Sequence, residues 1–313
     1  MKPQIPNFNM RILIPAIIAA ASFQLEAAPA AVSFDCAKVE TYKVASDDEL
    51  KLYIFNPDDH RPGKDKRPAI MFFFGGGWNG GTPGQFEQHC RYLAARGMVA
   101  ITADYRVKSR QNTSPKECVA DGKSAVRYIR QNANRLGIDP KWIAAGGGSA
   151  GGHVAATTGF VDGFEDPKDA QSISSKANAL VLFNPVYDNG PGGYGHDRVK
   201  DYWEKFSPAH NITKDDSPAV VFLGTKDSLI PVKTAEKFRD DMREAGIKSE
   251  LHLYEGQAHG FFNESKGGTE IFLDTIRKMD QFLVEAGFLK GKPTEQQVKA
   301  VSRPSTKKKK KKK

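Results

Sequence analysis

The chain has 313 residues, of which 39% are hydrophobic and 27% are charged, and this suits one large globular α/β domain or two small ones. Its formal net charge of +9 comes mostly from the lysine run of residues 307–313, so the body of the chain is nearly neutral. We interpret the run as a solvated tail, with contact to an anionic surface as the alternative. No arginine or aromatic residue interrupts it, so no nucleic-acid partner is expected.

The first thirty residues have the features of a secretory signal peptide. Lys2 and Arg11 are basic, residues 12–21 are apolar, and residues 28–30 (Ala-Pro-Ala) offer a small-x-small cleavage pattern. We therefore expect a secreted or periplasmic protein; a retained membrane anchor is the alternative, although ten apolar residues are short for a bilayer. No later segment reads as a membrane span.

The rest of the chain alternates between apolar runs typical of buried strands and segments with helical spacing of apolar residues. Two extended segments at residues 38–57 come first. In chain order, the next predicted elements are strand 67–77, helix 84–97, strand 98–107, helix 114–137, strand 141–149, strand 179–186, strand 219–227, helix 232–246, strand 249–256 and helix 269–287.

This alternation predicts an α/β fold with a mostly parallel central sheet and helices on both faces. Residues 161–178 are polar and predict a surface loop. Residues 186–217 are rich in Gly, Tyr, Trp and His and predict a short lid-like insertion. We expect one catalytic domain over residues 31–288, followed by a disordered Lys-rich tail at 289–313.

Export would permit disulfide bonds among the three cysteines. Cys90 and Cys118 lie in the two predicted helices that flank one strand, so they are the preferred pair, and Cys36 lies near the expected mature start. Three buried unpaired thiols are the alternative.

The segment WIAAGGGSAGGH, residues 142–153, contains the pattern Gly147-x-Ser149-x-Gly151 between the predicted strand at 141–149 and a helical pattern at 153–158. This context is typical of a nucleophile elbow, a sharp turn that holds a serine out from the sheet edge. Side chains two residues before and after the serine would come too close, which explains the glycines. The alternative is a glycine-rich turn with an idle serine.

A serine hydroxyl becomes a nucleophile only beside a base that is itself oriented by an acid. Asp227 ends the strand at 219–227, and His259 follows the strand at 249–256, so both should reach the edge that presents Ser149. Asp215 and Asp216 are the runner-up acids, but they precede their strand.

Gly76 and Gly77 end the apolar run at 67–77, where bare backbone N–H groups can approach a developing oxyanion. With the N–H of Ala150 they form the predicted oxyanion hole, in which losing one donor typically costs ~3 kcal/mol. A flexible loop is the alternative.

Together, GGGW (residues 75–78), GGSAGGH (147–153), GTKD (224–227) and GQAHGF (256–261) resemble the α/β-hydrolase superfamily. The resemblance is in particular to hormone-sensitive-lipase-like esterases and to secreted bacterial carbohydrate esterases and acetylesterases, and it covers about residues 35–288. It implies an α/β-hydrolase fold with Ser149, Asp227 and His259 as the catalytic triad.

The sequence departs from the lipase-like group in two ways. Phe74 stands where that group usually has a histidine before the glycines, so other groups must brace the loop. Few residues separate the expected cleavage site from the first strand, which leaves no room for a wide N-terminal cap. An open site suits a short acyl group on a bulky alcohol such as a sugar.

Aromatic residues of the insertion, Tyr187, Tyr194 and Trp203, together with Trp78, are the candidate substrate-binding residues. They could form stacking walls for a sugar or aryl group, and they could equally pack the insertion onto the domain.

We therefore expect a secreted serine esterase that removes short acyl groups, acetyl foremost, from a small-molecule or polysaccharide ester, with no metal and no cofactor. One alternative is a serine peptidase of the prolyl-oligopeptidase type, although no propeller domain and no acidic motif for a peptide amino terminus are evident. Another is a non-catalytic binding protein on a hydrolase scaffold, which would usually have lost a triad member.

Overall fold

The structure is a computed structural model that describes Met1 and residues 32–35, 37–45 and 47–302. The predicted signal peptide, Cys36 and the lysine run therefore lie outside the described residues, apart from Met1. No helix within the described ranges combines the length and the apolar character that crossing a bilayer requires.

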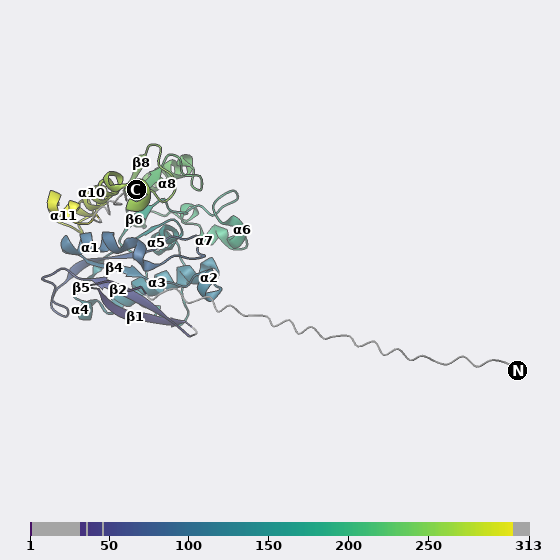
Figure 1. The fold of residues 1–313 in the computed structure, drawn as a ribbon, viewed down its shortest axis with the longest axis horizontal. Helices are drawn as coiled ribbons and strands as arrows, with labels where there is room; N and C mark the ends of the chain where they lie inside the picture. The colour runs from purple at the N-terminus through teal and green to yellow at the C-terminus, as the bar shows by residue number, and fades with distance from the viewer. Residues whose placement is uncertain (2–31, 36, 46, 303–313) are drawn as a thin grey trace. The chain divides into compact units, whose positions relative to one another are not determined.

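An eight-stranded sheet in the order β1-β2-β4-β3-β5-β6-β7-β8 forms the centre of the domain (Figure 1). The strands from β4 to β8 in this order pair in parallel, whereas β1 and β2 are antiparallel at one edge. The predicted mostly parallel α/β sheet is therefore confirmed. The strands are β1 Lys38–Ala45, β2 Asp48–Phe55, β3 Arg67–Phe73, β4 Val99–Ala103, β5 Ile138–Gly148, β6 Ala179–Phe183, β7 Ala219–Gly224 and β8 Ser249–Tyr254.

Helices cover both faces of this sheet, and each face has its own apolar core (Figure 1). Alternation along β3 divides its side chains between them: Met71 and Phe73 join one core, and Ile70 and Phe72 join the other. Helices α3 (Pro115–Gln131), α5 (Ala150–Phe160) and α8 (Val232–Glu244) line the first core, while α1 (Glu87–Ala95) and α10 (Thr269–Glu285) line the second. The shorter helices are η1 Pro83–Phe86, α2 Lys108–Gln111, α4 Ala133–Leu136, α6 His196–Val199, α7 Trp203–Phe206, η2 Pro208–His210, α9 Glu264–Gly267 and α11 Glu295–Lys299.

The preferred disulfide was wrong, because Cys90 and Cys118 are free, buried and on opposite faces of the sheet. In the sheet, β4 lies on one side of β3 and β5 lies on the other. The connection from β3 through α1 to β4 therefore moves toward β2, and the connection from β4 through α3 to β5 moves in the opposite direction. Since parallel crossovers are right-handed, these two helices must lie on opposite faces.

Packed structure continues beyond the predicted domain end at residue 288. Helix α11 begins with a capping box formed by Thr294 and Gln297, and its Val298 is buried in the second core. Gln297 Nε2 also donates a hydrogen bond of 3.2 Å to the carbonyl oxygen of Ala95. Residues 289–302 therefore belong to the domain, and the predicted tail boundary was too early.

The insertion at 186–217 carries α6, α7 and η2 and packs on the domain through its own small apolar cluster of Val119, Val199 and Phe206. The polar segment at 161–178 has few regular elements, as predicted for a loop. Its Glu165 accepts hydrogen bonds from Lys123 and Arg127 of α3 at 2.9 and 2.7 Å.

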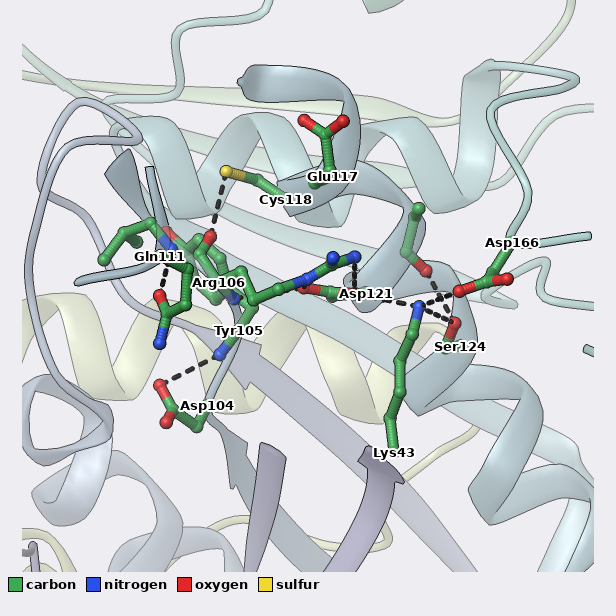
Figure 2. Close-up of polar contacts among 12 residues, drawn as sticks. Lys43, Asp104, Tyr105, Arg106, Gln111, Glu117, Cys118, Asp121, Ser124 and Asp166 are labelled. Atoms are coloured by element: carbon green, nitrogen blue, oxygen red, sulfur yellow. Dashed lines mark hydrogen bonds and ion pairs between the residues drawn. The ribbon is translucent and has the colours of Figure 1, made fainter. Parts of the chain in front are cut away.

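A buried ionic cluster joins the edge strand β1, the segment after β4 and helix α3 (Figure 2). Arg106 donates two hydrogen bonds of 2.7 and 2.8 Å to the carboxylate of Asp121, whose side chain is 0% exposed. Lys43 Nζ lies 2.8 Å from the same carboxylate and 2.6 Å from Asp166. Asp121 therefore compensates two cations that have little access to water.

We predict that Asp121→Asn lowers the free energy of unfolding by about 3 kcal/mol, because removing one member of a buried ion cluster leaves uncompensated charge. Urea unfolding followed by tryptophan fluorescence measures the change. Asp240→Asn, which removes the exposed partner of Arg239, is the control and should leave the midpoint essentially unchanged. Equal midpoints for the two variants would contradict the role given to the cluster.

Candidate active site

Ser149 lies on the turn between β5 and α5, with backbone angles φ 54° and ψ −120° that side-chain-bearing residues rarely adopt. The glycines around it are required by close packing. A Cβ on Gly147 would lie 2.3 Å from the carbonyl oxygen of Gly151, and a Cβ on Gly151 would lie 2.1 Å from that of Phe73. The strained turn and its glycines match the geometry expected of a nucleophile elbow.

A continuous chain of hydrogen bonds links the three residues predicted as a triad. His259 Nε2 lies 2.9 Å from Ser149 Oγ, and His259 Nδ1 lies 2.8 Å from Asp227 Oδ2. The Asp227 side chain is fully buried, and its Oδ1 accepts hydrogen bonds from the backbone N–H groups of Leu229 and Ile230 at 2.8 and 3.0 Å. The carboxylate is thus fixed and can hold the imidazole in one orientation.

The runner-up acids lie elsewhere. Asp216 pairs with Lys176 at 3.0 Å and accepts a hydrogen bond from the backbone N–H of Thr213. Neither Asp215 nor Asp216 lines the cavity that contains Ser149.

Asn184, at the end of β6, is a site residue that the sequence reasoning missed. Its Oδ1 accepts a hydrogen bond of 3.0 Å from the N–H of Gly260, and its Nδ2 lies 3.4 Å from His259 Nε2. Asn184 therefore holds the turn that carries the histidine. Its position in the sequence could have indicated this role, because Asn184 is a polar residue that directly follows a buried strand and so lies at the same sheet edge as Ser149.

The other histidines near the core have a different environment. His153 packs against Trp78 and Phe206, and His89 lies among phenylalanines on the opposite face. Burial lowers the pKa of each to about 3, so both imidazoles are neutral at physiological pH. Of the residues described, His259 supplies the imidazole at the cavity.

The loop after β3 presents backbone donors to Ser149. Gly76 and Gly77 have φ values of 140° and 64°, conformations that favour glycine. Within the described part of the chain, the N–H groups of Gly76, Gly77 and Ala150 donate to no protein acceptor. The predicted oxyanion donors are therefore available, and both glycines line the cavity with Ser149.

Phe74 and its neighbours show how this loop is braced without a histidine. The Phe74 ring stacks on Tyr105 with centroids 4.1 Å apart, and Tyr105 Oη donates a hydrogen bond of 2.5 Å to the carbonyl oxygen of Phe74. Gln85 Oε1 accepts a 2.6 Å hydrogen bond from the N–H of Gly75. Arg198, from the insertion, donates to the carbonyl oxygen of Gly77 at 2.6 Å.

These groups surround a cavity of about 310 Å³ that has Ser149 and His259 in its wall. Its lining carries no Asp or Glu side chain among the described residues. The residues that line it are Gly75, Gly76, Gly77, Gln85, Ser149, Asn184, Tyr194, Leu229, His259, Gly260, Phe262, Asn263 and Lys266.

The predicted aromatic walls need correction, because Trp78 and Tyr187 are 1% and 0% exposed and cannot contact a substrate. Trp78 packs edge-on against His153, and Tyr187 stacks on Phe238. Trp203 packs against two histidines of the insertion and does not line the cavity. Tyr194 is the member of the predicted set that faces it.

Comparison with known proteins gives two family matches that together span most of the domain. Residues 52–189 match the model described as BD-FAE, and residues 173–289 match the dienelactone hydrolase family. Among curated proteins, the chain is 28% identical over 224 residues to esterase LipC of Mycobacterium tuberculosis, covering 62% of this chain and 53% of that protein. The chain spans about half the length of the first curated relatives it matches.

Solved structures show a higher similarity. Thermogutta terrifontis esterase 2 phosphorylated by paraoxon is 46% identical, with a TM-score of 0.79, and the match covers 83% of this chain and 98% of that one. The butyrate-bound structure of the same esterase is 45% identical with a TM-score of 0.79, covering 83% and 97%.

We predict that Tyr105→Phe loosens the glycine loop, because it leaves the buried carbonyl of Phe74 without a donor. The unpaired group should lower the free energy of unfolding by about 1–3 kcal/mol. Hydrogen–deuterium exchange should show faster exchange in residues 75–80. Tyr128→Phe, which removes a half-buried hydroxyl bound to Glu40, serves as the control. Unchanged exchange in the loop would contradict the bracing role of Tyr105.

Proposed function

The chain belongs to the esterases of the α/β-hydrolase superfamily, and from this premise we propose that it is a serine carboxylic ester hydrolase that removes short acyl groups, acetyl foremost, from carbohydrate or other small esters. The observation that carries the proposal is the chain of hydrogen bonds from Ser149 through His259 to Asp227. Ser149 and His259 line a cavity together with Gly76 and Gly77, whose N–H groups have no acceptor among the described residues.

The geometry supports a two-step mechanism. Ser149 Oγ attacks the ester carbonyl carbon while His259 Nε2 accepts the hydroxyl proton, and Asp227 stabilises the imidazolium through Nδ1. His259 then donates the proton to the departing alkoxide, which leaves an acyl ester on Ser149. A water molecule that loses a proton to His259 then attacks the acyl carbon. The intermediate collapses by breaking the bond to Ser149 Oγ, which takes the proton back from His259 as the carboxylic acid is released.

The negative charge of each tetrahedral intermediate lies on the former carbonyl oxygen. The N–H groups of Gly76, Gly77 and Ala150 are proposed to stabilise it, because they donate to no acceptor among the described residues. Contacts from Tyr105, Gln85 and Arg198 hold the glycine loop in place. Donors that are already oriented stabilise the transition state without a reorganisation cost.

A short acyl group suits the volume of about 310 Å³. The butyrate-bound and propionate-bound structures of the Thermogutta esterase, which are similar to this chain, also support small acyl groups. Tyr194 supports a sugar alcohol, because it is the member of the predicted stacking set that lines the cavity.

We also propose that the protein is exported, on the strength of its N-terminal sequence alone. Residues 2–30 lie outside the described residues. N-terminal sequencing of protein recovered from a periplasmic or extracellular fraction would support the proposal if the chain began near Ala31, and an intact Met1 would oppose it.

Ser149→Ala is expected to reduce hydrolysis of 4-nitrophenyl acetate by at least about 10³-fold, because the nucleophile is removed while the fold is kept. Circular dichroism checks the fold, and Ser302→Ala is a control at a serine outside the cavity. Equal turnover by wild type and Ser149→Ala would refute the mechanism. A wild type without turnover would favour the binding-protein alternative.

A panel of 4-nitrophenyl esters with acyl chains of two to ten carbons tests the acyl preference. We expect kcat/KM to fall by about tenfold or more between butyrate and octanoate, because the longer chain cannot be contained in the cavity. Acetylated xylose tests the alcohol, and aminoacyl 4-nitroanilides test the peptidase alternative. Faster cleavage of the amides than of acetyl esters would reverse the proposal.

A further inference from the structure

Lys266 is a cavity residue for which ester hydrolysis alone gives no role. It belongs to α9 and lines the same cavity as Ser149 and His259. Its side chain lies along Gly260: a Cβ on Gly260 would be 2.9 Å from Lys266 Nζ and 3.0 Å from its Cδ. The ammonium group is therefore held beside the residue that follows His259.

The charge of Lys266 is not compensated within the part of the chain that the structure describes. No ion pair or side-chain hydrogen bond of its ammonium group is found there, and no acidic side chain lines the cavity. Asp227 lies behind the imidazole and is fully buried, with its two oxygens engaged by His259, Leu229 and Ile230. The cavity lining thus carries the positive charge of Lys266 and no carboxylate among the described residues.

The cavity also presents a neutral hydrogen-bond donor, the hydroxyl group of Tyr194. Tyr194 Oη would lie 2.8 Å from a Cβ on Gly77, which places the hydroxyl next to the proposed oxyanion loop. Among the described residues it has no hydrogen-bond partner. An ammonium group and a hydroxyl at one cavity, without an acidic side chain beside them, are suited to an anion.

We infer that the ester substrate carries a carboxylate or another anionic group in addition to its ester, and that Lys266 binds this group while the ester carbonyl lies at Ser149. The inference rests on the proposed hydrolase function and specifies its substrate class. Because Lys266 is exposed to solvent, its contribution to kcat/KM should be modest, about five- to tenfold.

The test compares charged and neutral esters of matched size. On the acyl side, 4-nitrophenyl hemisuccinate is compared with 4-nitrophenyl butyrate. On the alcohol side, 4-acetoxybenzoate is compared with its methyl ester. The readout is the ratio of kcat/KM for the charged ester to that for the neutral one.

We expect Lys266→Gln to lower this ratio about five- to tenfold in one of the two arms, with the change mainly in KM, and Lys266→Glu to lower it further. The arm that responds identifies the side of the ester that carries the charge. Salt at 0.5 M should reduce the wild-type ratio, since screening weakens an exposed ion pair. Lys237→Gln, at an exposed lysine of α8 outside the cavity, should leave the ratio unchanged.

A ratio that is the same in wild type and Lys266→Gln in both arms would overturn the inference and leave the proposed function intact. Absence of turnover for all four esters would instead overturn the proposed function, and the inference with it.

Discussion

The site depends on the close approach of two backbone segments, the start of α5 and the end of β3, at the carboxyl edge of the sheet. Gly151 allows α5 to begin against the carbonyl oxygen of Phe73, at a distance that no side chain would permit. This approach brings the loop after β3 beside Ser149, so that backbone donors and the hydroxyl open into the same cavity. The serine and the backbone donors lie side by side because this contact is free of side chains.

The insertion at 186–217 also supports the glycine loop. Arg198 lies over the rings of Trp78 and Tyr194, with 4.8 and 5.3 Å from its guanidinium carbon to the ring centroids, and donates to the Gly77 carbonyl. The segment therefore supports the glycine loop from outside. Tyr105 and Gln85 support it from the opposite end, and these contacts replace the histidine that Phe74 displaces.

The sequence allowed the catalytic candidates and the sheet to be predicted because each candidate directly follows an apolar run, and the ends of parallel strands share one edge. It could not show which aromatic side chains turn inward, since Tyr187 and Trp78 are buried by neighbours far away in the chain. Asn184 and Tyr105 were missed because both act on backbone atoms, and such contacts leave no motif. The predicted disulfide was wrong because the sequence does not give the strand order, which decides the face of the sheet on which each helix lies.

The two described cysteines have a practical consequence for inhibitor studies. Burial raises the pKa of both thiols, and neither Cys90 nor Cys118 lines the cavity. A thiol-alkylating reagent therefore has no reactive target in either core, whereas an organophosphorus compound would have one in Ser149 if this serine is the nucleophile that we propose. Inactivation by an organophosphorus compound, together with resistance to a thiol-alkylating reagent, would be the chemical signature of buried cysteines beside an accessible nucleophilic serine.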